Sequence, residues 1–287
     1  MSERYDQYDG WAWLYDRTMG PEYGKEQFAV LERVLLPRLK PEAEVFDLCC
    51  GTGQLISHLT SAGFRVTGLD GSEEMLARAK INASDAEFVL EDARVYREPK
   101  RYDAAFSTSA SLNHVPSMDD LRLVFENVCA SLRDDGVFVF DLNHPRQLEK
   151  WWRGRALEGM IAEDCAWMVT PRYDAGKKEG AFRVTMYRRP GRVSMIERLK
   201  RPLYRLLSLP RFIGLRLKLI ERFGMVEPSW DRHEIDFPVV GHDLGEVRNA
   251  LEAAGFTRVD LQTIEGSGTI DDDHSAYFIC SKKEVNS

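Results

Sequence analysis

A glycine-rich turn followed at a fixed distance by an aspartate is the first feature of the sequence that indicates chemistry. Gly51 and Gly53 end the segment 45–53, Val-Phe-Asp-Leu-Cys-Cys-Gly-Thr-Gly, and Asp70 comes 17 residues after Gly53. Glycines let the backbone approach a ligand closely and adopt dihedral angles that a β-carbon forbids. A carboxylate at Asp70 can accept hydrogen bonds from two ribose hydroxyls at the switch point of a βαβ unit. The spacing therefore predicts a nucleoside site.

The same turn lacks a feature that pyrophosphate sites use. The dinucleotide pattern Gly-x-Gly-x-x-Gly would place a third glycine where Ile56 stands. This favours a nucleoside without pyrophosphate. Two alternatives stay open: the glycines could form a tight turn that binds nothing, and Asp70 could cap the helix that follows it.

The elements that position these residues alternate between strands and helices. The apolar runs predict strands at 43–50, 64–70, 86–92, 102–109, 136–142, 257–266 and 275–283. Helices are expected at 24–40, 51–63, 72–83, 117–132 and 242–256. Their N-caps would be Ser72, Ser117 and Asp243. The predicted fold is therefore α/β, a doubly wound, seven-stranded, mostly parallel sheet.

The alternation stops after the fifth strand, between about residues 145 and 238. Segments 164–174 and 180–189 predict an antiparallel hairpin, with 230–237 as a third strand beside it. We therefore expect an N-terminal helical arm at 1–40 and a ligand-binding core made of 41–144 and 239–287. An antiparallel and helical insertion at 145–238 would form a lid or acceptor subdomain.

Four segments in order resemble class I, Rossmann-like methyltransferases that use S-adenosylmethionine, in particular a bacterial small-molecule-type subgroup. DLCCGTG at 47–53 is similar to the first family motif, with Cys49 in place of its first glycine. TGLDGSEEMLARA and LEDARVY are similar to the second and third motifs. The fourth segment, SASLNHV at 109–115, departs from the subgroup at Ala110 and His114, so the acceptor chemistry does not carry over.

The resemblance implies S-adenosylmethionine as cofactor, S-adenosylhomocysteine as product, and no metal. Asp70 would hold the ribose, while Asp92 and the backbone amide of Ala93 would bond to the adenine. Aromatic residues of the arm could close over the methionine part, or could only pack the arm on the sheet. The expected cofactor residues are Tyr15, Tyr23, Asp47, Cys49, Gly51, Gly53, Asp70, Gly71, Met75, Asp92, Ala93 and Ser107.

Methyl transfer to an oxygen or an ammonium releases a proton, so a general base helps. His114 follows the fourth predicted strand, and an imidazole titrates near neutral pH, although a loop histidine bonded to backbone is an equal alternative. His233, in the insertion, is the second catalytic candidate. The expected acceptor contacts are Asn113, Asn143, His144, Trp152 and Tyr173. The two aromatic residues could instead belong to the hairpin's own core.

The bulk composition limits the partners and the compartment. The 287 residues carry a net charge of −7, which gives no field to hold a polyanion, so no nucleic-acid partner is expected. The five scattered cysteines indicate free thiols in a reducing compartment. The start of the sequence lacks a signal-peptide pattern, and no window approaches the ~18 apolar residues of a membrane span. We expect a cytoplasmic protein.

One segment has the opposite charge to the rest of the chain. Residues 192–222 contain nine Lys or Arg against two Glu, with apolar residues between them, and Pro202 and Pro210 divide the segment into short helices. We favour a helical lid, which would suit a phosphorylated or carboxylated acceptor. The alternative is contact with a membrane surface or an acidic partner.

The leading interpretation is a methyltransferase that transfers a methyl group from S-adenosylmethionine to nitrogen or oxygen of a small molecule. One alternative is a methyltransferase of a lipid or membrane-bound acceptor that docks through 192–222. Another is a cofactor-binding regulatory protein without activity, since Cys49 and Ala110 depart from the family motifs. The sequence predicts neither the acceptor nor the oligomeric state.

Overall fold

The structure is a computed structural model that describes residues 5–191 and 195–282, with the backbone alone at 195–199 and 201. The chain forms two compact units. Unit 1 contains Met1–Leu148 and Val240–Ser287, and unit 2 contains Glu149–Val239. Helix α7 (Pro145–Trp151) and strand β9 (Asp231–Val240) contain the two boundaries. That the insertion is a lid or binds an acceptor stays a prediction.

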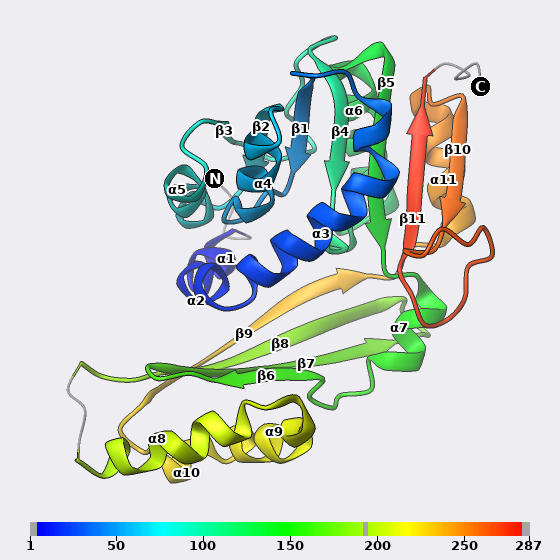
Figure 1. The fold of residues 1–287 in the computed structure, drawn as a ribbon. Helices are drawn as coiled ribbons and strands as arrows, with labels where there is room; N and C mark the ends of the chain where they lie inside the picture. Colours follow the sequence, from blue (N-terminus) through cyan, green and yellow to red (C-terminus); the bar gives the residue numbers. More distant parts are fainter. Residues whose placement is uncertain (1–4, 192–194, 283–287) are drawn as a thin grey trace. The chain divides into compact units, whose positions relative to one another are not determined.

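Unit 1 is built on a seven-stranded sheet with the strand order β10-β11-β5-β4-β1-β2-β3 (Figure 1). All pairs among β1 to β5 are parallel, while β11 is antiparallel to both β5 and β10. The strands are β1 (Glu44–Leu48), β2 (Arg65–Asp70), β3 (Glu87–Leu90), β4 (Tyr102–Ser107), β5 (Leu132–Leu142), β10 (Arg258–Gln262) and β11 (Ala276–Ser281). The predicted doubly wound, mostly parallel sheet is confirmed. Its order reverses between β1 and β4, which makes the carboxyl ends of these strands the expected ligand position.

Helices cover both faces of this sheet. The core on one face contains residues of α3 (Gly20–Val34) and α4 (Gln54–Ser61), and the core on the other contains residues of α6 (Met118–Ser131) and α11 (Leu244–Ala254). Helix α5 (Glu73–Asn82) follows β2, and the short helices η1 (Leu36–Arg38) and η2 (Ser111–His114) follow α3 and β4. The predicted N-caps form, because the side chains of Ser72, Ser117 and Asp243 each accept a backbone N–H from the first turn.

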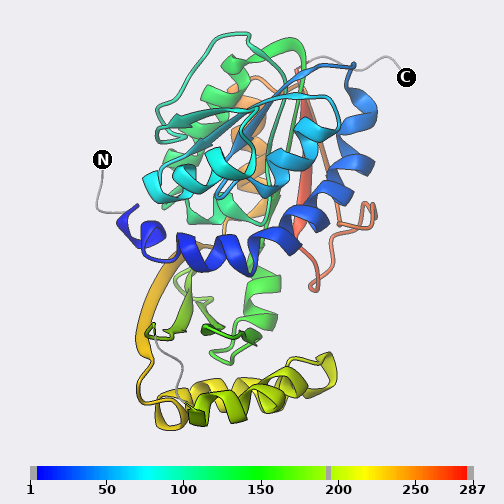
Figure 2. The same cartoon turned by 60° about the vertical axis from the view of Figure 1, so that its left-hand side comes forward.

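The N-terminal arm consists of α1 (Asp6–Asp9) and α2 (Ala12–Arg17), which lead into α3 (Figure 2). Trp11 and Leu14 are buried. Asp16 of α2 accepts hydrogen bonds from Gln54 Nε2 of α4 (2.8 Å) and Asn82 Nδ2 of α5 (2.6 Å). In Figure 1 the arrowheads of β1 and β4 point to the end of the sheet at which α1 and α2 lie. The arm is therefore attached where the ligand position is expected.

Unit 2 is built on a four-stranded sheet with the order β6-β7-β8-β9, whose first three strands pair antiparallel. Strands β7 (Cys165–Asp174) and β8 (Glu179–Arg188) form the predicted hairpin, and β9 lies beside β8 as predicted. The sequence interpretation missed β6 (Glu158–Ile161), because four residues are too few for a clear alternation. Helices α8 (Met195–Leu207), η3 (Pro210–Phe212), α9 (Ile213–Glu221) and α10 (Phe223–Val226) join β8 to β9.

Unit 2 has its own hydrophobic core. Ile161 and Tyr187 of the sheet pack with Tyr204, Ile220 and Phe223 of the helices. Across the described ranges of the chain, no helix is long and apolar enough to cross a membrane.

Candidate functional site

The turn after β1 has the geometry that the glycine pattern predicts. Cys49, Gly51 and Gly53 all have positive φ, at 62°, 55° and 78°. A Cβ on Gly53 would lie 2.9 Å from the Cα of Ala79 in α5, so this glycine is required for helix packing. A Cβ on Gly51 would make an ordinary van der Waals contact with the ring of Tyr15, at 3.7 Å. Cys49 adopts the left-handed conformation that explains the glycine usual at its position in the motif.

Asp70 connects this turn to the start of α5. Its Oδ2 accepts the backbone N–H of Gly51 at 2.9 Å, and its Oδ1 accepts that of Ser72 at 2.9 Å. Burial raises the pKa of Asp70, while these backbone hydrogen bonds oppose the rise. Both carboxylate oxygens are therefore fixed in direction, and each keeps a lone-pair position for a further donor. The capping alternative stays open as well, because Asp70 accepts the N–H of Ser72, the N-cap residue of α5.

A recess of about 400 Å³ lies beside the turn, between the arm, α3 and the segment after β4. Five of the predicted cofactor residues line it: Tyr15, Tyr23, Asp47, Cys49 and Gly51. The rings of Tyr15 and Tyr23 meet edge to face with centroids 6.3 Å apart. Asp47 is buried at its inner end, where burial and then the charge of Asp70 raise its pKa well above the usual value.

Other lining residues were missed by the sequence interpretation. They are Gly20, Gly24, Gln27, Cys50, Gln54, Leu55, Thr108, Ser109 and Ser111. The spacing of Gly20 and Gly24 was the available signal, because small residues four apart let helices approach. A Cβ on Gly24 would lie 2.8 Å from Cβ of Gln54, which shows how closely α3 and α4 approach.

The segment after β4 has a strained backbone. Ser109 and Ala110 are consecutive non-glycine residues with positive φ, at 60° and 54°. The carboxylate of Asp141, at the end of β5, accepts the N–H of Ala110 at 3.0 and 3.1 Å. Burial raises the pKa of Asp141 to about 7, opposed by hydrogen bonds from Ala110 and neighbouring amides. Asp141 therefore holds the turn whose residues Ser109 and Ser111 line the recess.

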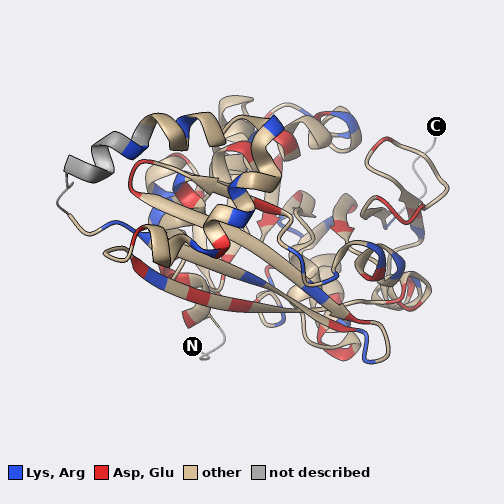
Figure 3. Cartoon of the chain, turned by 90° about the horizontal axis from the view of Figure 1, so that it is seen from below, with Lys and Arg blue, Asp and Glu red and all other residues tan. Residues whose placement is uncertain are grey.

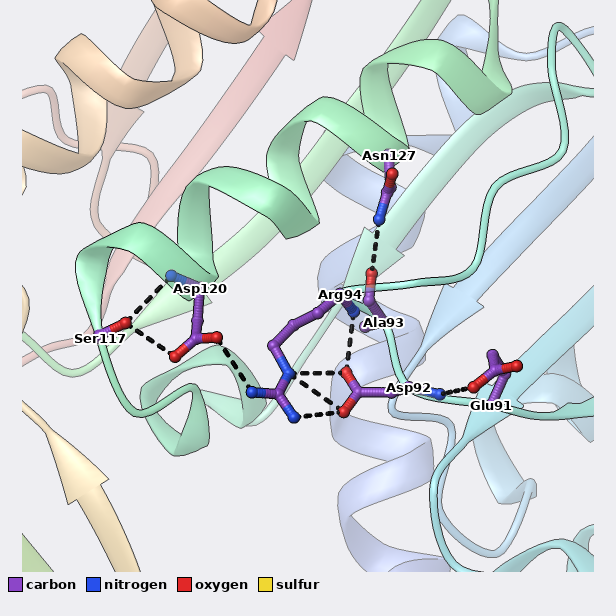
Figure 4. Close-up of polar contacts among 7 residues, drawn as sticks. All are labelled: Glu91, Asp92, Ala93, Arg94, Ser117, Asp120 and Asn127. Atoms are coloured by element: carbon purple, nitrogen blue, oxygen red, sulfur yellow. Dashed lines mark hydrogen bonds and ion pairs between the residues drawn. The ribbon is translucent and has the colours of Figure 1, made fainter. Parts of the chain in front are cut away.

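Asp92 lies at the start of a charged network that links the segment after β3 to α6 (Figure 4). Arg94 donates to Asp92 through Nη2 at 2.6 Å and to Asp120 through Nη1 at 3.0 Å. Asn127 of α6 donates to the carbonyl oxygen of Ala93 at 3.4 Å. Although burial opposes the shift, hydrogen bonds from Arg94 and Tyr5 lower the pKa of Asp92 to about 2. An adenine amino group would have to share this carboxylate with Arg94 and Tyr5.

The arm occupies the space beside Gly71. A Cβ on Gly71 would overlap the ring of Tyr5, which also hydrogen-bonds Asp92. Asp9 of α1 accepts hydrogen bonds from Ser72 Oγ and from the N–H of Glu74, at the N-terminus of α5. Met75 of α5 is buried. Tyr5 therefore fills the space at Gly71 and bonds to Asp92, the carboxylate that the resemblance assigns to the adenine.

Ser107, the last residue of β4, is fully buried, and its Oγ has no hydrogen-bond partner within the residues described. Among the described residues, Ser107 is the one predicted cofactor residue whose buried side chain has a polar atom without a hydrogen-bond partner. A cofactor contact at Ser107 stays a prediction.

Three residues expected to contact an acceptor have structural contacts instead. Asn113 is buried; its Nδ2 donates to the carbonyls of Asn143 (2.9 Å) and Val240 (2.8 Å), and its Oδ1 accepts the N–H of Asn143 (2.9 Å). Asn143 Oδ1 accepts from Ser275 Oγ. His144 is buried, its Nε2 lies 2.9 Å from the carbonyl oxygen of Asp271, and burial lowers its pKa. The acceptor contacts expected of these three residues stay predictions.

The two catalytic candidates differ in their surroundings. His114, in η2, is half-buried and its ring meets that of Tyr8 edge to face at 5.9 Å. His233 is exposed on β9 of unit 2. Also in unit 2, Trp152 meets Phe182 edge to face at 6.3 Å, and the backbone N–H of Tyr173 donates to the carbonyl of Trp152. The expected roles of His233, Trp152 and Tyr173 stay predictions.

Metal binding is not indicated in the described part of the chain, where no three His, Cys, Asp or Glu side chains are grouped as ligands.

Comparison with known proteins identifies relatives of this chain. Residues 45–136 match a family described as "Methyltransferase domain". "Uncharacterized methyltransferase sll0829" of Synechocystis is 31% identical over 149 residues, which are 51% of this chain and 68% of that protein. A dTDP-3-amino-3,6-dideoxy-alpha-D-glucopyranose N,N-dimethyltransferase of Streptomyces fradiae is 31% identical over 143 residues, 48% of this chain and 52% of that protein.

Solved structures extend the likeness of fold over nearly the whole chain. A S-adenosylmethionine-dependent methyltransferase from Clostridium acetobutylicum aligns with a TM-score of 0.69 at 15% identity, over 96% of this chain and 98% of that one. Streptomyces venezuelae DesVI aligns with a TM-score of 0.67 at 18% identity, over 99% and 100%.

The fold and the recess define a doubly wound α/β protein whose recess lies at the switch point of its sheet. The sequence relatives make the assignment specific: the chain belongs to the class I S-adenosylmethionine-dependent methyltransferases. It spans 55% and 60% of the length of two other curated methyltransferases that it matches, from Bacillus subtilis and Geobacillus.

Proposed function

We propose that this chain transfers a methyl group from S-adenosylmethionine to nitrogen or oxygen of a small molecule. The observation that carries the proposal is the fixed carboxylate of Asp70, held by the N–H groups of Gly51 and Ser72 beside the turn that lines the recess. Such a carboxylate fits a ribose diol. The acceptor class is supported by relatives whose names describe dimethylation of dTDP-linked amino sugars.

The residues around the recess fit the cofactor. Asp70 would hold the ribose, and Tyr15, Tyr23 and the glycine turn would enclose the methionine part in the recess. Aromatic side chains suit this position because a sulfonium is a cation that ring faces attract. Bound there, the cofactor would supply an activated methyl group to the lone pair of the acceptor.

The chain's own contribution is orientation and, where needed, proton removal. The turn at Ser109 and Ser111 lines the recess and is held in place by Asp141. His114 follows on η2, where it would take the proton that an ammonium or hydroxyl acceptor releases. Enclosure by the arm would exclude water from the reacting atoms.

Calorimetric titration with S-adenosylhomocysteine tests the cofactor site. We expect micromolar binding, roughly −8 kcal/mol, with none for NAD. Asp70→Asn should weaken binding about tenfold or more, since it replaces one acceptor oxygen with a donor. The control is Asp85→Asn, an exposed aspartate just before β3, which should bind like wild type. Equal affinities for the two variants would refute the ribose assignment.

Turnover is tested separately, by S-adenosylhomocysteine release with amines and hydroxyl compounds that include dTDP-linked amino sugars. Product from at least one acceptor supports the enzyme. Tight cofactor binding without product across the set would favour the alternative of a cofactor-binding protein without activity.

A further inference from the structure

Exposed apolar side chains are concentrated on the helices of unit 2. Twelve large hydrophobic residues are exposed in the part of the chain that the structure describes, and six of them fall between residues 203 and 225. These six are Leu203, Leu206, Leu209, Ile213, Leu215 and Met225, with exposed fractions of 51%, 45%, 43%, 42%, 58% and 75%. Half of the exposed large hydrophobic residues in the described part of the chain therefore lie in one segment of 23 residues.

These side chains are not the ones that attach the helices to their sheet. Tyr204, Leu207, Ile220 and Phe223 are buried on the inner side, and most of them join the core of unit 2. On α8, Leu203 and Leu206 lie on the flank next to Tyr204 and Leu207. On α9, Leu215 lies away from Ile220, since five residues turn the helix by more than 120°. The exposed leucines are therefore not part of the core of unit 2.

Basic side chains alternate with these leucines. Arg205, Arg211, Lys218 and Arg222 are exposed, and Glu221 is the one acidic residue within 202–222. Figure 3 shows blue bands along the helix that begins in the grey segment. We call the following set the basic leucine face: Leu203, Arg205, Leu206, Leu209, Arg211, Leu215, Lys218 and Arg222. The basic segment of the sequence begins earlier, at residue 192. Residues 192–194 and the side chains at 195–199 and 201 lie outside the described part of the structure.

The charge of this face argues against a second copy of the chain as its occupant. A two-fold dimer brings the same patch of each copy together. Such a dimer would place arginine and lysine against arginine and lysine, with leucines unable to offset the repulsion. Four exposed basic side chains against one exposed glutamate within 202–222 favour an anionic partner.

The apolar residues argue for lipid over an acidic protein. Protein interfaces depend on tryptophan, tyrosine and arginine anchors, and leucine is under-represented among them. Here the aromatic residues Tyr204, Phe223 and Trp230 are buried, and the exposed apolar residues are aliphatic. Leucine beside arginine and lysine on short helices is the composition of helices that lie in a membrane interface.

We propose that the basic leucine face docks the protein on an anionic phospholipid surface. The aliphatic side chains enter the headgroup boundary, and Arg205, Arg211, Lys218 and Arg222 contact lipid phosphates. Docking of this kind is peripheral, reversible and weakened by salt, because exposed charges are screened within about 10 Å at 0.1 M salt. It does not depend on methyl transfer, so its failure would leave the proposed function intact.

Vesicle co-sedimentation of the full chain tests the proposal. We expect vesicles with about 30% phosphatidylglycerol to bind at least about tenfold more protein than vesicles of phosphatidylcholine alone. This binding should be lost in about 0.5 M salt. Equal binding to both vesicles, or none to either, overturns the proposal.

Paired variants assign the binding to the face. Leu206→Ser with Leu215→Ser should reduce binding several-fold, while Leu123→Ser with Leu157→Ser removes two leucines of similar exposure (47% and 44%) elsewhere and should have no effect. Arg205→Gln with Lys218→Gln should also reduce binding. Its charge-matched control, Lys177→Gln with Lys178→Gln, alters the exposed β7–β8 turn and should bind like wild type.

Circular dichroism and melting of each variant exclude loss of fold as the cause. If a pair of substitutions on the basic leucine face and its control pair reduce vesicle binding equally, the proposal is wrong. If the leucine variants instead dissociate a dimer of the wild-type chain and vesicles do not bind, the face is a protein interface, and the proposal is equally wrong.

Discussion

At the scale of single residues, a buried carboxylate holds a strained backbone beside the recess. Ser109 and Ala110 both adopt the left-handed region, which costs about 1–2 kcal/mol per residue. Asp141 offsets part of this cost through its hydrogen bonds to the N–H of Ala110. The pKa of Asp141, raised to about 7 by burial, is the measurable sign of this arrangement.

Asp141→Asn should change the pH dependence of stability. The folded-state pKa of about 7 exceeds the unfolded value, so the folded chain keeps a proton that the unfolded chain releases, and this group's contribution falls as pH rises from about 4 to about 7. Asparagine retains one acceptor oxygen and does not titrate. The free energy of unfolding of wild type relative to the variant should therefore fall by up to about 1.4 kcal/mol per pH unit in this window. A constant difference in urea unfolding from pH 4.5 to 7 would contradict this.

The position of Tyr5 gives a second prediction at this scale. Its ring fills the space at Gly71 and bonds to Asp92, so it must move before an adenine can enter there. Tyr5→Ala removes this competition, and we expect S-adenosylhomocysteine to bind about threefold tighter or more, because a larger fraction of the protein is competent. Stopped-flow fluorescence should show faster association. Weaker binding in the variant would instead mean that Tyr5 contacts the bound cofactor.

At the scale of elements, the charged network of Figure 4 joins the segment after β3 to the N-terminus of α6. Arg94 bonds to both Asp92 and Asp120, and Ser117 caps the helix by accepting the N–H of Asp120 at 3.0 Å. The network fixes the segment that carries Ala93, which is expected to meet the adenine.

Arg94→Gln should lower the free energy of unfolding by about 2 kcal/mol at pH 7, since it leaves two half-buried carboxylates without their cation. The control is Arg122→Gln, on helix α6, which also carries Asp120. Arg122 is exposed and pairs with Asp119 one turn away, so its loss should cost under about 0.5 kcal/mol. Because the pKa of Asp92 is lowered to about 2, the contribution of this pair is present above pH 4 and lost toward pH 2. Equal effects of the two variants in urea unfolding at pH 7 would contradict the proposed role of the network.

At the scale of the whole molecule, each unit has its own core. Phe223 is fully buried in unit 2 among Tyr187, Tyr204 and Trp230. Phe223→Ala should destabilise unit 2 by roughly 3–5 kcal/mol. Hydrogen exchange should rise in residues 149–239, while exchange in 1–148 and the affinity for S-adenosylhomocysteine should stay near wild type. A matching rise in β1 and β4 would show that the two units unfold as one.

The sequence by itself determined the sheet of unit 1 and the ends of its helices. Strand and helix periodicity, the caps Ser72, Ser117 and Asp243, and the glycine turn are local, because each depends on residues within a few positions. The hairpin of unit 2 followed from the same rules, whereas β6 was too short for them. Asp47, Cys49 and Gly51 line the recess because they lie at the carboxyl end of β1, beside the switch point. Tyr15 and Tyr23 reach it from helices α2 and α3.

The tertiary structure alone decided what several polar side chains do. Asn113 bonds to Val240, 127 residues away, and Asp141 to Ala110, 31 residues away. Neither pairing leaves a trace in local periodicity, so the sequence did not predict these partners of Asn113 and Asp141. Tyr5 shows the same limit, since only packing brings the arm against Gly71. Local propensity sets elements and turns, while contacts between distant residues depend on how the elements pack.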